Sequence, residues 1–551
     1  MGITIFISYA TKDSNTFQIA KLVERLTKYP EIDDALYWEE DMHDDIYKYM
    51  EKNIGRCDVF LLFCSQNALN SEPIEMEWMA ALKKKKKIIP IFIDEEEIPN
   101  LLSTRLGIQF RKDDVDRTIE SIYQLILKKL NVSPKRPKKP VEKKEIEKKE
   151  IVDFRSAQVF QLEADILQEI EKLTKKQFTM VNEVNYRTKM GFSTENQRVI
   201  GIGLYKCDIS TLPESTGNLS SLKELHLYHN QLTTLPESIT KLESLQTLNL
   251  RRNKLTTLPE SIGNLKSLQE LDLVNNWLST LPESIGKLES LQMLALWDNQ
   301  LSTLPESIGT LKSLQTLDLY KNQLSTLPES IGNLSSLREL YLYENQLTTL
   351  PEFIGNLSSL VELDLRRNQL TTLPESIGKL ESLQMLALWD NQLSTLPESI
   401  GNLKSLQGLG LWDNKLTTLP ESIGNLESLQ ELSLGGNQLS TLPESISNLK
   451  SLQILILSSN KLSTLPESMG NLKSLHVLYL DLNQFTTLPE SIGNLKSLYT
   501  LYLSDNQFTT LPEFIINMTS LKKLYISRNP LDSKAKSVVK QLKKKGVKVS
   551  K

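Results

Sequence analysis

Residues 222–244, LKELHLYHNQLTTLPESITKLES, form one unit of a 23-residue repeat that decides the fold of most of the chain. The motif LxxLxLxxN recurs fifteen times in one phase, from the unit beginning at Val199 to the unit beginning at Leu521. Each unit repeats one apolar set, which in this unit is Leu222, Leu225, Leu227, Leu232, Leu235, Ile239 and Leu242. One unit is too short to bury these side chains alone, so neighbouring units must stack. The sequence therefore predicts a solenoid over residues 199–531.

The other repeated residues also have structural explanations. Alternating leucines predict a short strand in each unit, and successive strands would line a concave face. An asparagine after each strand recurs from Asn230 to Asn529, with Cys207 in its place in the first unit. Its amide can satisfy the inward backbone groups of adjacent turns. The segment LPESI then predicts a convex helical turn, because Pro fits the first turn and Glu suits the positive end of the helix.

The repeat resembles the leucine-rich repeat family of the 23-residue intracellular type over about residues 199–531. The resemblance implies an α/β horseshoe that binds a partner, usually a protein, on its concave side and has no catalytic activity. Residues 154–198 read as a polar, helical N-terminal cap, and residues 532–551 read as a C-terminal capping helix and tail. We therefore expect both ends of the solenoid to be covered.

The predicted concave positions are unusually aromatic and charged. One column of them supplies our candidates for partner binding: Tyr228, Arg251, Trp297, Tyr320, Tyr343, Arg366, Trp389 and Trp412. Binding interfaces favour aromatic and arginine anchors. The alternative is that the rings only cover neighbouring strands, and near-identical units such as 291–309 and 383–401 suggest that some anchors are copies. Acidic residues at other concave positions argue against a nucleic-acid partner; they include Asp272, Glu339, Glu362, Asp364, Asp390 and Asp413.

Composition limits the remaining possibilities. The chain has 551 residues and a formal charge of −4, which gives no general attraction to nucleic acid or to an anionic membrane. No stretch is apolar enough to span a bilayer, and the N-terminus lacks a signal-peptide pattern, so we expect a cytoplasmic protein. Cys57, Cys64 and Cys207 fit neither a disulfide framework nor a metal site, and the four histidines are scattered.

Residues 132–153 form a composition break. Three prolines, Pro134, Pro137 and Pro140, are followed by blocks of Lys and Glu, which is typical of a linker that holds its flanks apart. A lysine run at 83–87 is open to two interpretations. It suits a phosphate or nucleic-acid patch, but we favour the solvated C-terminal end of a helix.

Residues 1–131 predict a separate α/β domain. Apolar runs at 3–8, 58–64 and 88–93 read as buried parallel strands, and helical spacing occurs at 15–26, 74–82 and 116–130. This order predicts a doubly wound sheet, which binds ligands beyond the carboxyl ends of its strands. Those ends carry Ser8, Tyr9, Asp13, Trp38, Asp41 and Ser65, our candidates for substrate binding.

The domain resembles the TIR domain. FISYA at 6–10 with Asp13 is similar to its first box, and CDVFLLFCS at 57–65 is similar to its central strand. The Pro-Gly of the second box is absent between Trp38 and Ile46. The resemblance implies a flavodoxin-like fold, with helices on both faces of a parallel sheet, and self-association between TIR domains.

The TIR resemblance also implies cleavage of the bond between nicotinamide and ribose in NAD⁺, which would be a substrate, so that we expect no cofactor and no metal. Asn67, Ser71, Glu77 and Ala81 follow the spacing around the family's catalytic glutamate. Glu77 is therefore the catalytic candidate, because a carboxylate can stabilise the oxocarbenium-like ribose. The alternatives are a solvated helix glutamate at Glu77 and the neighbouring Glu75 as the active carboxylate. Trp38 and Tyr9 suit stacking on a ring of NAD⁺ or simple packing.

Together the two parts predict a cytosolic sensor in immunity or antiphage defence, with NAD⁺ nucleosidase activity triggered by a ligand of the repeats. The resemblance is to immune receptors, although no GxxxxGK[ST] phosphate loop is present. The competing class is a non-catalytic adaptor, which the missing Pro-Gly favours.

Overall fold

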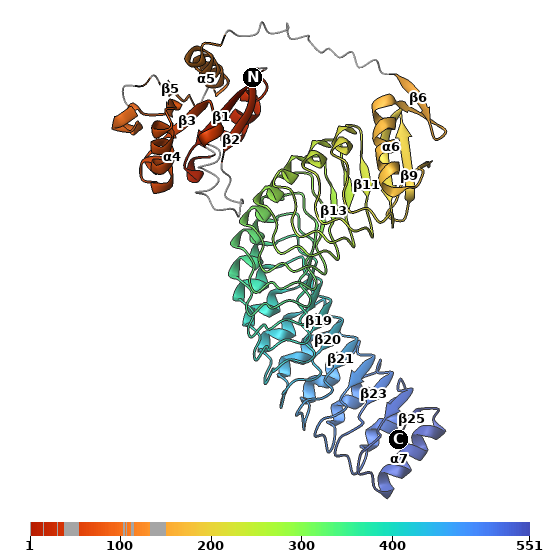
Figure 1. The fold of residues 1–551 in the computed structure, drawn as a ribbon. Coiled ribbons are helices and arrows are strands. Elements are labelled where there is room, and N and C mark those ends of the chain that lie inside the picture. Colours follow the sequence, from red (N-terminus) through yellow and green to blue (C-terminus); the bar gives the residue numbers. More distant parts are fainter. Residues whose placement is uncertain are drawn as a thin grey trace. The chain divides into compact units, whose positions relative to one another are not determined.

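The computed structural model describes residues 2–14, 16–29, 31–37, 54–102, 105, 107–111, 115–132 and 150–550. The chain divides into two compact units, residues 1–148 and 149–551 (Figure 1). Most of the predicted linker lies outside the described residues, and its last residues belong to a strand of the second unit.

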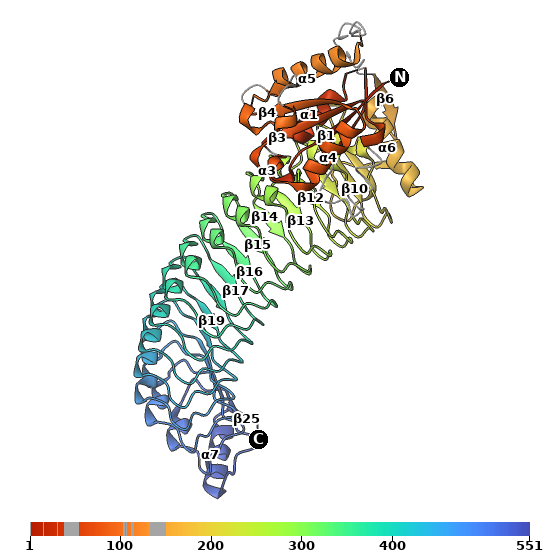
Figure 2. The same cartoon turned by 60° about the vertical axis from the view of Figure 1, so that its left-hand side comes forward.

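The first unit is built on a parallel sheet with the order β2-β1-β3-β4-β5. Its strands are β1 (Ile3–Ser8), β2 (Ile32–Tyr37), β3 (Val59–Cys64), β4 (Lys87–Phe92) and β5 (Ile108–Gln109). The helices are α1 (Ile19–Leu26), α3 (Gln66–Leu69), α4 (Glu72–Lys83) and α5 (Val115–Leu130), with 3₁₀ turns η1 (Thr11–Asp13), η2 (Glu95–Glu97) and η3 (Asn100–Leu102). One apolar core joins the sheet to α1 and α5, and a second joins it to α3 and α4 (Figure 2). This is the doubly wound, flavodoxin-like fold that the sequence predicts.

The sequence prediction omits the edge strand β2. Asp33 and Asp34 interrupt its apolar pattern, and both are exposed, because an edge strand needs no continuous apolar run. The central strands β1 and β3 are buried along their whole length apart from half-buried Thr4, which is why their apolar runs are recognisable.

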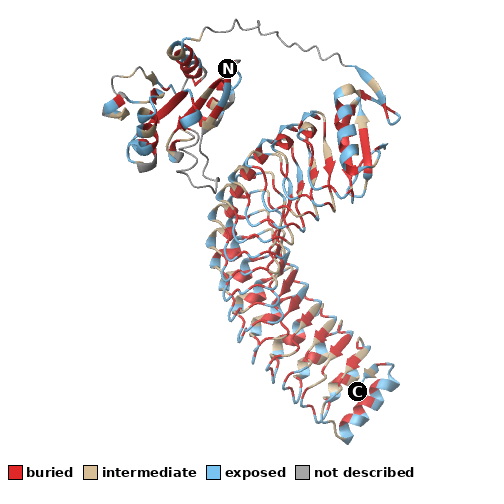
Figure 3. Cartoon of the chain, viewed as in Figure 1, coloured by how far each residue is buried: buried red, intermediate tan, exposed pale blue. Residues whose placement is uncertain are grey.

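The second unit is a solenoid whose strands pair in parallel with the next repeat (Figure 1). Leu225 pairs with Leu248, and the same leucine-to-leucine register continues to Leu524. After β10 (Arg198–Leu204) the three-residue strands are β11 (Glu224–His226), β12 (Thr247–Asn249), β13 (Glu270–Asp272), β14 (Met293–Ala295), β15 (Thr316–Asp318), β16 (Glu339–Tyr341), β17 (Glu362–Asp364), β18 (Met385–Ala387), β19 (Gly408–Gly410), β20 (Glu431–Ser433), β21 (Ile454–Ile456), β22 (Val477–Tyr479), β23 (Thr500–Tyr502) and β24 (Lys523–Tyr525). The repeated leucines form one continuous buried core (Figure 3).

The convex turns are 3₁₀ helices, from η4 (Glu214–Asn218) to η17 (Glu513–Asn517). All but η6 (Ile262–Asn264) directly follow a proline. In several turns the glutamate after the proline accepts a hydrogen bond from the next turn, as Glu306 does from the Ser330 N–H at 3.1 Å. The glycine near the end permits close stacking, since a Cβ at Gly309 would lie 2.2 Å from the Ser330 carbonyl oxygen. The prediction of a convex helical turn is confirmed in its tighter 3₁₀ form.

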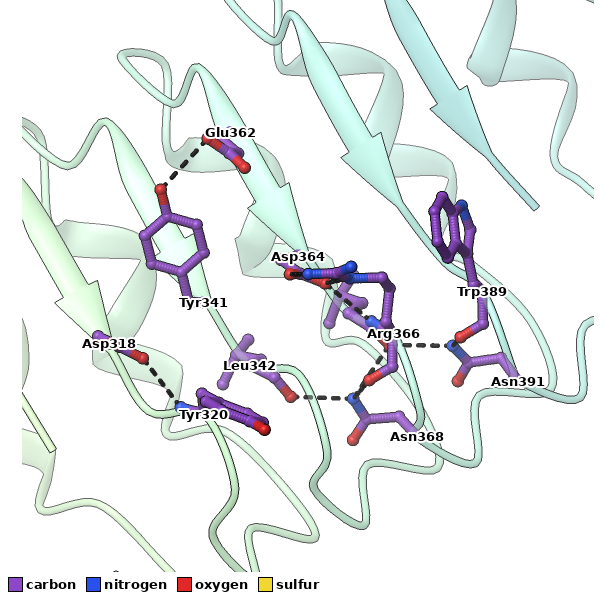
Figure 4. Close-up of polar contacts among 11 residues, drawn as sticks. Asp318, Tyr320, Tyr341, Leu342, Glu362, Asp364, Arg366, Asn368, Trp389 and Asn391 are labelled. Atoms are coloured by element: carbon purple, nitrogen blue, oxygen red, sulfur yellow. Dashed lines mark hydrogen bonds and ion pairs between the residues drawn. The ribbon is translucent and has the colours of Figure 1, made fainter. Parts of the chain in front are cut away.

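The asparagine of each repeat joins adjacent turns, as the sequence predicts. Asn368 accepts a hydrogen bond from the Leu347 N–H at 3.0 Å and donates to the Leu365 carbonyl at 3.0 Å. It also donates to the Leu342 carbonyl at 3.0 Å (Figure 4). At the first repeat, Asn230 accepts from the Cys207 N–H at 3.0 Å. These contacts satisfy backbone groups that would otherwise be buried without partners.

The N-terminal cap differs from the predicted helical segment. Only α6 (Gln161–Thr174) is helical, and the remaining elements are strands β6 (Ile151–Phe154), β7 (Ala157–Phe160), β8 (Thr179–Met180) and β9 (Lys189–Glu195). β9 pairs antiparallel with β10 and so covers the first repeat. The buried carboxylate of Glu163 on α6 fixes the cap, since it binds the Arg198 guanidinium at 2.8 Å and the Val199 N–H at 2.7 Å.

The C-terminal end is closed by a helix and a strand. Helix α7 (Ser533–Lys544) begins at Asp532, whose carboxylate accepts the Ala535 N–H at 2.8 Å. The predicted capping helix is therefore present. The following strand β25 (Lys548–Ser550) was not predicted, and it pairs with β24.

Candidate active site and concave surface

Glu77 lies on α4 and faces the carboxyl end of β1. Its side chain is only 6% exposed, and its carboxylate accepts a hydrogen bond from the Ser8 hydroxyl. Burial raises the pKa of Glu77 from 4.5 to about 7, and the bond from Ser8 opposes part of this rise. A buried carboxyl that titrates near neutral pH at the end of a sheet strand is typical of catalytic acids and bases.

Glu75 occupies a different environment on the same helix. It is exposed and lines a cavity of about 270 Å³ together with Leu62, Trp78 and Leu101. Cys64 also lines this cavity, but burial raises the pKa of its thiol to about 12, so it is protonated and a poor nucleophile. Glu77 does not line the cavity, so the two neighbouring glutamates are clearly distinguished by their surroundings.

Asp13 and Ser65 join the loops that follow β1 and β3. The buried Asp13 carboxylate accepts hydrogen bonds from the Ser65 hydroxyl and from Asn67 Nδ2, the latter at 2.7 Å. Ser65 in turn accepts the Ala68 N–H at 3.0 Å and so caps α3. This network fixes the shape of the loops beside Ser8. Sequence reasoning identified Asp13 and Ser65 but not their direct contact.

Replacing Asp13 by Ala is expected to lower the stability of the N-terminal unit by about 2 kcal/mol, because the buried Ser65 hydroxyl and the Asn67 amide lose their acceptor. Urea unfolding of residues 1–132 measures the change. A suitable control is Ser121→Ala, which removes an exposed hydroxyl bonded only within its own helix. If Asp13→Ala and Ser121→Ala lower the free energy of unfolding by the same amount, the hydrogen bonds of Asp13 do not stabilise the loops.

The remaining candidates are placed less directly. Tyr9 is half-buried and packs against the apolar core beneath α1 and α5. Trp38 and Asp41 fall within residues 38–53, which lie outside the described part of the chain. Among the described residues, no group of three or more His, Cys, Asp or Glu side chains has the arrangement of a metal site. Within the same ranges, no helix has the length and apolar character needed to span a membrane.

The residues of the predicted aromatic column lie just after the short strands of the solenoid, two residues beyond the end of each strand. Trp297, Tyr320 and Tyr343 stack in sequence, with ring centroids 5.2 and 4.5 Å apart. These rings cover one another, as the packing interpretation of the column expects. Tyr228, at the start of the column, stacks on Tyr205 at 5.1 Å.

Arg366 continues the column, and Figure 4 shows its guanidinium bound to Asp364, with Trp389 in the next repeat. Its Cζ lies 4.8 Å from the Tyr343 centroid and 5.5 Å from that of Trp389. Asp364 binds the same guanidinium through two oxygens, with Nε to Oδ1 at 2.8 Å and Nη2 to Oδ2 at 2.5 Å. Arg251 is placed similarly, 5.2 Å from the Trp297 centroid. The surface therefore combines cation–π contacts with carboxylates.

Two carboxylates lie on this surface, of which sequence reasoning named Asp272 but missed Asp318. Asp272 and Asp318 lie on strands β13 and β15, and burial raises the pKa of both. The sequence shows that Asp272 and Asp318 occupy the same position two repeats apart, but it does not show how far their side chains are buried.

Comparison with known proteins agrees with both parts of the chain. A family model described as a leucine-rich repeat region matches residues 201–280, 282–368, 362–434, 399–479 and 444–545, and one described as a TIR domain matches residues 5–126. No curated protein matches the chain. A leucine-rich repeat protein of Leptospira interrogans is 38% identical over 70% of this chain and 92% of its own, with a TM-score of 0.59. The Toll–Spatzle complex of Drosophila shares the fold at 18% identity, with a TM-score of 0.53 over 86% of this chain and 61% of the other.

Proposed function

Because the chain belongs to the leucine-rich repeat family and carries an N-terminal TIR domain, we propose that it is a cytosolic immune-type sensor, acting in antiphage defence. In this proposal the repeats bind a protein ligand on their concave face, and the TIR domain cleaves NAD⁺ to nicotinamide and to linear or cyclic ADP-ribose. The observation that carries the enzymatic part is the buried Glu77 carboxyl at the carboxyl end of β1.

Glu77 supplies the group that this reaction needs. The bond between ribose and nicotinamide breaks so that its electron pair leaves with nicotinamide, which departs neutral, and positive charge develops on the ribose. An ionised carboxylate stabilises that charge. Water then adds to the ribose carbon and gives up a proton to a base or to solvent, which yields ADP-ribose.

Ligand binding activates the domain through association in this proposal. The chain lacks a phosphate-binding loop, so no nucleotide-driven switch is visible. A tether of about 20 residues raises the local concentration of TIR domains once repeats are brought together by a ligand.

Release of nicotinamide from NAD⁺ by the full chain, followed by chromatography at rising protein concentration, tests the proposal. We expect the amount of nicotinamide to equal that of linear and cyclic ADP-ribose together. A folded, associating protein that releases neither would instead support the adaptor function, which the absent Pro-Gly between Trp38 and Ile46 favours.

The rate is expected to rise with pH, with a midpoint near the Glu77 pKa of about 7, because the ionised carboxylate is the active form. Ser8→Ala removes the hydrogen bond that lowers this pKa, so its midpoint should lie at higher pH than that of the wild type. Initial rates measured across the neutral range give both midpoints. A rate independent of pH across this range would show that the ionisation of Glu77 does not control the reaction.

A further inference from the structure

Two tryptophans of the concave face lie directly on glycines of the next repeat. A Cβ at Gly410 would lie 1.9 Å from Trp389 Nε1, and a Cβ at Gly435 would lie 3.0 Å from Trp412 Cε3. Other residues at these positions would force the indoles away from the backbone. Strand β19 is unusual in this respect because two of its three residues, Gly408 and Gly410, are glycine.

A hollow of about 590 Å³ in the concave face is lined by both of these indoles. Its walls and floor include Tyr343, Arg366, Trp389, Trp412, Glu431 and Ile456. Trp389 remains 43% exposed and Trp412 remains 38% exposed, in contrast with the fully buried leucines beneath them. An exposed indole pair in a concave site is a binding feature, since burying these rings in an interface is favourable.

The charges around the hollow leave an acidic excess. The Arg366 guanidinium is held by Asp364, and Arg367 Nε lies 3.6 Å from Asp390. Asp413 and Glu431 also line the hollow, and neither forms an ion pair with another described residue. A cation entering the hollow would therefore meet carboxylates whose charge is not already neutralised.

The adjacent slot of the same surface already holds a cation. Arg366 lies between Tyr343 and Trp389 and binds Asp364 through two oxygens. The guanidinium thus uses ring faces and a carboxylate at once, which is the combination that the hollow also offers. Tyr343, Arg366 and Trp389 all line the hollow as well, so this slot forms one wall of it.

We propose that the hollow formed by Trp389, Trp412 and Glu431 binds an arginine side chain from a basic segment of a protein ligand. The inference rests on the proposed role of the concave face as the ligand surface, and it specifies the chemistry of that ligand. The guanidinium stacks on the indoles and hydrogen-bonds to Glu431 or Asp413, in the manner of Arg366 in the adjacent slot.

The test uses the full chain and a synthetic peptide of alternating glycine and arginine, with binding followed by calorimetry. The matched peptide replaces each arginine by citrulline, which keeps the length and planar shape but carries no charge. We expect the citrulline peptide to bind at least about tenfold more weakly, since a desolvated cation–π contact and a charged hydrogen bond are both lost. Equal binding of the two peptides would overturn the proposal.

Variants locate the binding on the surface. Trp389→Leu removes one indole, and Gly410→Ala leaves every functional group present but pushes the Trp389 ring from its position. Both are expected to weaken binding of the arginine peptide about tenfold. Trp277→Leu is the control, because Trp277 is 50% exposed on the same solenoid but does not line the hollow. The Trp277→Leu variant should bind the arginine peptide with the affinity of the wild type. Thermal unfolding of each variant checks that it is folded.

Three further results would contradict the inference. One is absence of binding by the arginine peptide, and another is equal affinity in Trp389→Leu and Trp277→Leu. The third is Trp389-dependent binding of a neutral glucose oligosaccharide in place of the peptide, which would make the hollow a sugar site. In each case NAD⁺ cleavage by the TIR domain remains measurable, so the enzymatic proposal stands or fails separately.

Discussion

Glu77→Gln is expected to stabilise the N-terminal unit at alkaline pH while it lowers NAD⁺ cleavage by about 100-fold or more. The pKa of the Glu77 carboxyl is about 7 in the folded protein, compared with 4.5 for an unperturbed glutamate. Ionising it in its buried position therefore costs up to about 3 kcal/mol above pH 7. Glutamine keeps the shape and the contact with Ser8, and it carries no charge.

The sign of the effect follows from the direction of the pKa change. Because the folded pKa is raised, the Glu77 contribution is fully present below pH 4.5 and is lost as the pH rises through about 7. Wild type and Glu77→Gln should therefore unfold at the same urea concentration at pH 4.5 and diverge as the pH rises. Exposed Glu75 provides the control, and Glu75→Gln should show no such divergence. A Glu77→Gln variant less stable than wild type at alkaline pH would contradict the burial of an ionisable carboxyl.

Asn368→Ala is expected to destabilise the solenoid by about 3 kcal/mol or more, because it leaves one buried N–H and two carbonyls without their partner. These are the Leu347 N–H and the carbonyls of Leu342 and Leu365. Since each repeat contacts only its neighbours, hydrogen exchange should show the loss centred on the turns around Asn368.

Asn529→Ala is the matched control for this effect. Asn529 makes similar bonds, to the Phe508 N–H and the Leu503 carbonyl, but its contacts are only partly buried in the last repeat. Asn529→Ala should lower the stability less than Asn368→Ala, because water can replace part of the lost hydrogen bonds at this partly exposed position. Equal losses at the two positions would mean that burial does not set the strength of the asparagine ladder.

The repeat region was predictable because one 23-residue pattern is copied with constant phase. Because the same leucine positions recur in fifteen units, the strand register and the asparagine ladder of the whole region follow from the pattern of one unit. The cap over 154–198 has no such repetition. Its strand β9 contains Gly191 and polar residues within a mostly buried stretch, and only pairing with β10 determines that it is extended.

The candidate active site was predictable in its residues but not in its contacts. The spacing of the TIR resemblance favours Glu77, but it leaves Glu75, two residues earlier, as an alternative. Separation comes from the tertiary fold, which brings Ser8 of β1 against Glu77 and leaves Glu75 exposed. Likewise, the close approach of Trp389 to Gly410 in the next repeat is a relation that needs the stacking of two units.

The most direct measurement is nicotinamide release from NAD⁺ by the wild-type chain, Glu77→Gln and Glu75→Gln at matched concentrations. Wild type and Glu75→Gln should release nicotinamide at equal rates that rise per molecule as the protein associates, and Glu77→Gln should fall by about 100-fold or more. Equal release by Glu77→Gln and the wild type, or no release by a folded and associated wild type, would contradict the assignment of Glu77 as the catalytic carboxylate.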